Sequence, residues 1–110
     1  EMLDYIFIHY ADDMTLAKIA AHFCLQPNYF STLFHRETGC TFNRFLTDIR
    51  MDKACEAMLH NPEQSLEVIS QDVGIQNLPY FFRLFRERTG MTPRDFCAIA
   101  ERLNSSAAGR

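Results

Sequence analysis

The fold is decided by the stretch Tyr80-Phe81-Phe82-Arg83-Leu84-Phe85 and by the Thr89-Gly90-Met91-Thr92-Pro93 that follows it. The same order of residues occurs 51 positions earlier, as Tyr29-Phe30, Leu33-Phe34, Thr38-Gly39 and Thr41. Further upstream, Leu16 and Ile19 recur as Leu66 and Ile69 with an offset of 50, which places one extra residue in the second copy, near Asn77. A repeat with this period indicates one supersecondary unit used twice.

Working outward from the repeats, the spacing of apolar residues and caps predicts seven helices and no strand, an all-α fold. Each repeat is a short helix, a tight turn and a second amphipathic helix, the outline of a helix-turn-helix. Pro27 suits the first turn of its helix, and glycines at 39 and 90 suit left-handed caps at helix ends. The helices are expected near residues 2–10, 16–22, 27–38, 42–60, 66–73, 78–89 and 93–103.

The repeats also define the expected organisation of one domain over residues 1–104. Residues 1–40 form the first helix-turn-helix unit, residues 41–61 a linker helix, and residues 62–104 the second unit. At ~1.5 Å per residue the linker is roughly 27 Å long, and we expect it to be rigid. Residues 105–110 are predicted to be a flexible polar tail.

Composition narrows the class of protein. Of the 110 residues, 47% are hydrophobic, which is enough for a packed core and argues against disorder. No apolar run approaches the ~20 residues of a membrane span, and no signal peptide is evident, so the expected location is the cytoplasm. The cysteines at 24, 40, 55 and 97 are widely spaced and have apolar neighbours, which favours four reduced core thiols.

Catalysis and metal binding are not indicated. The carboxylates Asp12 and Asp13 lie in a loop without a glycine-rich phosphate cradle, and the neighbours His22 and Cys24 have no evident third group to orient them. The four His and four Cys do not cluster, so neither a metal nor a cofactor is expected. The sequence therefore predicts a protein that is not an enzyme.

Charge gives a mixed signal. The net charge of −3 opposes nucleic-acid binding, for which a basic balance is usual. Its distribution is uneven, because the window 83–94 holds four arginines against Glu87 alone. The positive field is thus concentrated in the second repeat.

The second helix of each repeat has an outward face that could meet DNA. In the first copy this face carries the hydrogen-bonding side chains Asn28, Ser31, Thr32 and His35. In the second copy it carries Pro79, Phe82, Arg83 and Arg86. Phe82 could meet a thymine methyl, and Arg83 could reach guanine O6 and N7. Alternatively, both faces are simply exposed to solvent and bind nothing. For Phe82, the rotation of the helix could also be misassigned, or the ring could pack against a further domain.

These residues resemble the DNA-binding domain of AraC/XylS-family transcription regulators. The resemblance rests on Tyr29 to Phe34 with Thr38-Gly39 in the first half, and Tyr80-Phe81 with Thr89 to Pro93 in the second. It extends over about residues 3–100, and the stretch 49–54 is similar to the family's linker. It implies sequence-specific binding of double-stranded DNA, with two recognition helices in successive major grooves.

The resemblance also implies roles for individual residues. The family's base-reading positions fall at Asn28, Ser31, Thr32, Pro79, Phe82 and Arg83, and the neighbouring His35 shares that face. Phosphate contacts are expected from Tyr29, Tyr80, Arg86, Arg94 and Arg36. Members usually carry a separate effector-binding, dimerisation or receiver domain and act on RNA polymerase. The alternative function is a helical protein-interaction module that uses the same scaffold without DNA.

Overall fold

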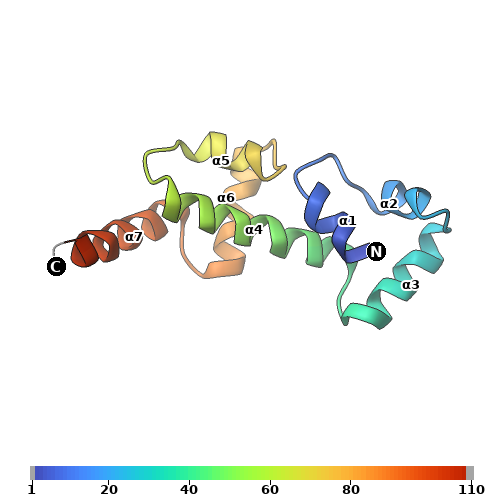
Figure 1. The fold of residues 1–110 in the computed structure, drawn as a ribbon. Helices are drawn as coiled ribbons and strands as arrows, with labels where there is room; N and C mark the ends of the chain where they lie inside the picture. The colour runs from blue at the N-terminus through green and yellow to red at the C-terminus, as the bar shows by residue number, and fades with distance from the viewer. Residues whose placement is uncertain (1, 109–110) are drawn as a thin grey trace. The chain divides into compact units, whose positions relative to one another are not determined.

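The computed structural model describes residues 2–108, with side chains described as far as residue 103. Over these residues it contains seven helices and no strand, as predicted. Figure 1 shows their order along the chain. Their bounds are α1 Met2–His9, α2 Leu16–His22, α3 Pro27–Thr38, α4 Phe42–His60, α5 Leu66–Asp72, α6 Leu78–Thr89 and α7 Pro93–Ala108.

The repeat is visible in the backbone hydrogen bonds. Leu25 donates its N–H to Ala20 at 2.9 Å, and Ile75 donates to Ser70 at the same distance, an offset of 50. At the next helix start, Phe30 donates to Gln26 and Phe81 to Asn77, an offset of 51. The extra residue of the second copy is therefore Gln76, and Asn77 is the structural counterpart of Gln26.

The turn inside each helix-turn-helix needs a left-handed residue. Gly74 has a φ of 95° and its counterpart Cys24 has a φ of 59°. Among the described residues, Cys24 is the only one other than glycine with a positive φ. Only glycine adopts this conformation without a clash of its Cβ. The first repeat thus has the same turn geometry as the second, with a strained residue in it.

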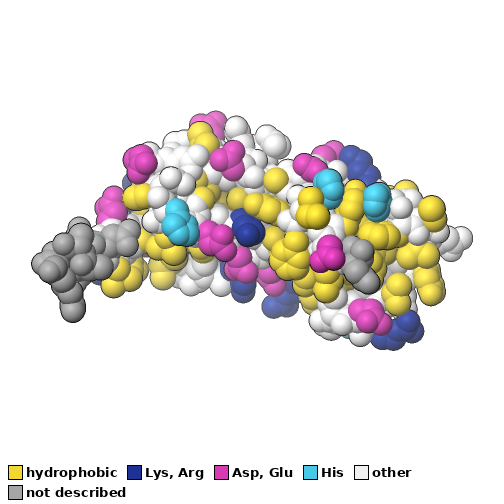
Figure 2. All heavy atoms as spheres, viewed as in Figure 1, with side chains coloured by type: hydrophobic (Ala, Val, Ile, Leu, Met, Phe, Trp, Pro, Cys, Tyr) yellow, Lys and Arg dark blue, Asp and Glu magenta, His cyan; other side chains and the backbone are white. Residues whose placement is uncertain are grey.

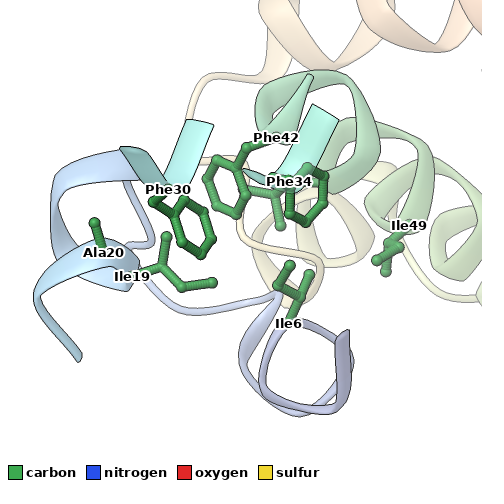
Figure 3. Packing of buried hydrophobic residues seen from close by; sticks show 8 residues of the cluster. Ile6, Ile19, Ala20, Phe30, Phe34, Phe42 and Ile49 are labelled. Atoms are coloured by element: carbon green, nitrogen blue, oxygen red, sulfur yellow. The ribbon is translucent and has the colours of Figure 1, made fainter. Parts of the chain in front are cut away.

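The chain divides into two compact units, Glu1–Ile49 and Arg50–Arg110. In the first unit, Figure 3 shows Ile6 of α1 pointing toward Phe34 of α3, with Phe30 and Phe42 beside it. The ring centres of Phe34 and Phe42 lie 5.9 Å apart, nearly perpendicular, a favoured aromatic geometry. Fully buried aromatic rings hold α3 by one face, so its other face stays exposed.

The second unit has the equivalent core. Phe81 and Phe85 of α6 are fully buried, and Phe85 packs edge-on against Phe96 of α7 at 5.6 Å. One polar side chain is buried with them in the described part of the chain, Ser70, whose hydroxyl donates to the Ile75 carbonyl at 2.6 Å. This hydrogen bond closes the turn between α5 and α6.

The linker helix is shared between the units. α4 is a single helix of 19 residues, as predicted. Its first half contributes Phe42, Leu46 and Ile49 to the core of the first unit. Its second half belongs to the second unit and buries the side chains of Met51, Ala54 and Met58.

The expected burial of the cysteines needs correction. None of the four thiols is a core thiol, because Cys24 is exposed and the other three are only partly buried. In α1 only Ile6 is fully buried, whereas Leu3 and Phe7 are 40% and 51% exposed. Figure 2 shows hydrophobic side chains reaching the surface over α1.

The last helix is also longer than expected. α7 continues to Ala108, beyond the expected end at residue 103, because no glycine or proline interrupts residues 104–108. Residues 105–108 of the expected tail are therefore helical, and residues 109–110 lie outside the described residues.

Candidate nucleic-acid interface

α6 presents the outward face that its sequence predicts. Phe81 and Phe85 are fully buried, which fixes the rotation of the helix and leaves Pro79, Arg83 and Arg86 exposed. Phe82 is 39% exposed, a large fraction for an aromatic ring. The predicted phase of the helix is confirmed, and the alternative of a misassigned phase is excluded.

The start of α6 is fixed by its cap. Asn77 Oδ1 accepts a hydrogen bond from the backbone N–H of Tyr80 at 2.9 Å, which satisfies a donor that the helix leaves without a partner. Pro79 lies in the same first turn, where its missing N–H removes no intrahelical bond. The first turn of α6 is therefore rigidly built, and Tyr80 and Arg83 project from it.

Beside this face lies a basic cavity of about 580 Å³ between residues of α5, α6 and α7. Three guanidinium groups line it, and none of its described lining residues carries a carboxylate. Its lining residues are Leu66, Phe82, Arg83, Arg86, Thr92, Pro93 and Arg94. We call it the arginine cavity.

The start of α7 adds to the positive potential of the arginine cavity. Thr92 Oγ1 accepts a hydrogen bond from the backbone N–H of Asp95 at 3.1 Å, so Thr92 caps α7. The positive end of the α7 dipole thus lies at the cavity wall formed by Thr92, Pro93 and Arg94. A helix N-terminus combined with guanidinium groups favours an anion such as a phosphate.

Arg88 shows why position on α6 matters. Its Nη2 donates to Asp52 Oδ1 of α4 at 3.0 Å, within the second unit. Its charge is therefore balanced by a carboxylate. The predicted concentration of positive charge is thus formed by Arg83, Arg86 and Arg94, which line the same cavity.

Arg83 has a further contact on the same helix. Its Cζ atom lies 4.9 Å from the centre of the Tyr80 ring, one turn earlier on α6. This is a cation–π contact between a predicted base-reading residue and a predicted phosphate-binding residue. The structure thus brings these two side chains together.

α3 exposes all of its predicted site residues. Asn28, Tyr29, Ser31, Thr32, His35 and Arg36 are exposed, and Phe30 and Phe34 are fully buried on the opposite side. Unlike α6, α3 has a cap residue, Gln26, whose side chain makes no capping hydrogen bond. Nearby, Lys18 of α2 donates to Asp13 at 2.9 Å, so its charge is balanced. The exposed face of α3 is thus polar rather than strongly basic.

Two of the partly buried thiols, Cys55 and Cys97, do not have the environment of reactive thiols. Burial raises the pKa of the Cys55 thiol, and the Asp52 carboxylate raises it further. Burial likewise raises the pKa of Cys97, with a smaller contribution from Glu101. Such thiols are poor nucleophiles near neutral pH. Over the described residues, no group of three His, Cys, Asp or Glu could hold a metal ion.

Sequence reasoning missed part of the arginine cavity. Leu66 and Thr92 were noted only as residues of the repeat, yet both line it. The available signal was the short distance in sequence between the Gly90 cap and Thr92-Pro93-Arg94, which keeps the start of α7 near α6.

No described helix is long and apolar enough to span a membrane.

Comparison with known proteins agrees with this geometry. A family model described as "Helix-turn-helix domain" matches residues 19–98. The chain is 35% identical over 94 residues to the regulatory protein PocR of Salmonella typhimurium. This aligned region covers 86% of this chain and 31% of PocR. It is 31% identical over 102 residues to the arabinose operon regulatory protein of Escherichia coli, covering 92% of this chain and 35% of that protein.

Among solved structures, the C-terminal domain of AraT, a response regulator from Geobacillus stearothermophilus, superposes with a TM-score of 0.86 at 31% identity. The match covers 89% of this chain and 81% of that domain. The chain spans about a third of the length of the curated relatives it matches.

Proposed function

The chain belongs to the AraC family of helix-turn-helix transcription regulators, and we propose that it binds double-stranded DNA in a sequence-specific manner. In this proposal α3 and α6 are the two recognition helices and enter successive major grooves. Members of this family are transcription regulators and not enzymes.

The observation that carries the proposal is the combination of an exposed helix face and a cavity lined by arginines in the second unit. The face of α6 exposes Phe82 and Arg83, and both side chains also line the arginine cavity. Base reading requires exposed side chains on one helix face, and duplex binding requires cations that can meet phosphates. α6 offers both within two turns of helix.

For base reading we propose Arg83 and Phe82 as the principal contacts of the second unit. Arg83 would donate two hydrogen bonds to guanine O6 and N7, a pair of adjacent acceptors that no other base presents in the major groove. Phe82 would pack against a thymine methyl, and this contact accounts for an exposed aromatic ring beside three arginines. Pro79, at the start of the helix, would contact the bases at the edge of the site.

For phosphate binding we propose Arg86 and Arg94, together with the N-terminus of α7. Both arginines line a cavity without a carboxylate in its lining, so an anion there would meet no opposing charge. Tyr80 would add a hydroxyl contact. Each such phosphate contact contributes to affinity for any duplex sequence.

In the first unit, α3 would read bases through Asn28, Ser31, Thr32 and His35. These groups can donate or accept hydrogen bonds, and all four are exposed. Tyr29 and Arg36 would contact phosphates. Because this face carries less positive charge than α6, we expect the second unit to supply more of the salt-dependent affinity.

The rest of the protein enters the proposal through the family. We propose that the full-length regulator works in the cytoplasm, contacts RNA polymerase, and carries a further domain for effector binding, dimerisation or signal reception. What supports this is the similarity to regulators about three times as long as this chain.

The test is selection of bound sequences from a random duplex pool by this chain. If both recognition helices bind DNA, the selected site should contain two separate blocks of preferred bases, centred roughly one turn of DNA apart, and should not be a palindrome. A single short block would show that only one unit reads DNA. If binding does not weaken as salt rises, the helical protein-interaction module would be favoured instead.

A further inference from the structure

We propose that Tyr80 is a positioning residue, whose ring holds the Arg83 guanidinium in place for reading guanine. This goes beyond a phosphate contact by the Tyr80 hydroxyl, because it assigns the ring a role in sequence preference. The inference rests on the proposed function, since it takes Arg83 to be a base-reading residue.

The geometry that carries it lies within α6. Arg83 follows Tyr80 by three residues, so both side chains leave the same side of the helix one turn apart. The guanidinium carbon lies 4.9 Å from the centre of the ring, within the range of a cation–π contact. Tyr80 itself is held at its backbone by the Asn77 cap at 2.9 Å. The backbone from which the ring projects is thus held at the start of the helix, and the ring offers a flat surface to the Arg83 side chain.

Arg83 has another partner within reach in the sequence. Glu87 lies four residues later on the same helix, a spacing that permits an ion pair. In the described part of the chain, however, Arg83 makes no ion pair, and its guanidinium lies over Tyr80. The charge is therefore directed toward the first turn of α6, where recognition helices contact base edges.

Stacking on Tyr80 and hydrogen bonding to guanine are compatible. A cation–π contact uses the flat face of the guanidinium, whereas its N–H donors point outward in the plane of the group. The edge remains available for guanine O6 and N7 while the face rests on the ring. The contact can consequently persist in the complex.

Holding Arg83 in advance should also strengthen binding. A free arginine side chain loses considerable rotamer entropy when it is fixed against a base. A side chain that already rests on an aromatic ring has fewer rotamers to lose. The benefit falls on the sequence that Arg83 reads, so it should appear as specificity and not as general affinity for DNA.

The first unit provides a natural comparison. Tyr29 is the counterpart of Tyr80 and is 56% exposed, but the residue three positions later is Thr32, which has no charge. Tyr29 therefore cannot hold a base-reading cation in the same way. Loss of the Tyr29 ring should weaken DNA binding without changing preference in the part of the site that Arg83 reads.

The experiment compares four single variants of this chain, Y80L, Y80F, R83A and the control Y29L, together with the double variant Y80L/R83A. Each is measured on the selected duplex, on the same duplex with the guanine read by Arg83 replaced, and on an unrelated duplex, at one salt concentration. Circular dichroism confirms folding, which we expect to be preserved because Tyr80 is 43% exposed.

We expect Y80L to lower the preference for guanine about two- to fivefold, the effect of an exposed cation–π contact. Y80F should keep that preference and weaken all three duplexes about equally, since it retains the ring and loses the hydroxyl. In the double variant Y80L/R83A, the loss of guanine preference should equal that of R83A alone.

The outcomes separate the two proposals. If R83A changes guanine preference but Y80L does not, the positioning role of Tyr80 is wrong and the proposed function stands. If Y80L raises guanine preference, the stack competes with base reading, and the inference is also overturned. If R83A itself leaves preference unchanged, the assignment of α6 within the proposed function fails first.

Discussion

Cys24 and Gly74 occupy the same turn of the two repeats, and both have a left-handed backbone, with φ of 59° and 95°. The hydrogen bonds that follow them are equivalent, from Leu25 to Ala20 and from Ile75 to Ser70. The same turn is thus built once with the residue suited to it and once with a strained one.

We predict that Cys24→Gly stabilises the protein. A residue with a Cβ loses about 1–2 kcal/mol in the left-handed region, whereas the greater freedom of glycine in the unfolded chain returns about 0.4–1 kcal/mol. The Cys24 side chain is exposed, so little packing is lost. The expected gain is about 0.5–1 kcal/mol in the free energy of unfolding, measured by urea denaturation.

The matched variant is Gly74→Ala, which places a Cβ in the equivalent turn. It should lower the free energy of unfolding by about 1 kcal/mol. If Cys24→Gly instead lowered the free energy of unfolding by about 0.4–1 kcal/mol, the cost of the freedom of glycine alone, the turn of the first unit would carry no strain.

The helices and their ends could be predicted from sequence because their signals are local. Gly39 and Gly90 end their helices in left-handed conformation, as expected, and Thr15, Ser65 and Asn77 act as caps through their side chains. These residues act on backbone groups within a few positions, so no knowledge of tertiary structure is needed.

What the sequence could not provide depends on contacts between distant residues. Arg88 was indistinguishable from Arg83 and Arg86 by pattern, and only the fold brings Asp52 within 3.0 Å of it. The apolar residues of α1 fit a helix, but how much of that helix is covered depends on α3 and α4. The cysteines were placed in the core from apolar neighbours in sequence, which says little about neighbours in space.

Phe82 leads to a prediction about the DNA and not the protein. If its ring meets a thymine methyl, replacing that thymine by uracil removes only the methyl group and should weaken binding about three- to tenfold. The measurement compares the two duplexes with the parent chain and with Phe82→Ala. For Phe82→Ala the thymine and uracil duplexes should bind alike, and a persistent difference would assign the methyl to another residue.

The thiols of Cys55 and Cys97 should lose their protons at higher pH than an ordinary cysteine. Because burial raises the pKa of Cys55 and Cys97, their thiolate forms appear only above the usual pH range for cysteine, near 9. The proton is bound more tightly in the folded chain, so these groups contribute stability that is lost as the pH rises through that range. We expect alkylation of both at pH 8 to be slower than alkylation of exposed Cys24, as followed by mass spectrometry of the digested protein.

A matched variant tests the cause at Cys55. Asp52→Asn removes the carboxylate that adds to the effect of burial, so Cys55 should react faster while Cys97 is unchanged. Because burial is the larger cause, the reaction should remain slower than that of an unfolded cysteine. Unchanged reactivity of Cys55 would mean that Asp52 has no influence on this thiol.

The arginines of α6 should fall into three classes by their environment. Arg83→Ala should weaken binding to the preferred sequence by about 1–3 kcal/mol and flatten preference at one position, a guanine. Arg86→Ala should weaken all duplexes about equally and reduce the slope of log affinity against log salt by about one phosphate contact. Arg88→Ala removes the same formal charge from the same helix, but that charge is already balanced by Asp52. It should change the salt slope least, which makes it the control for net charge.

The measurement is affinity for the preferred and an unrelated duplex at two salt concentrations. If Arg83→Ala behaves like Arg86→Ala, Arg83 holds the backbone and does not read a base. If all three variants behave alike, net charge and not position on α6 governs binding.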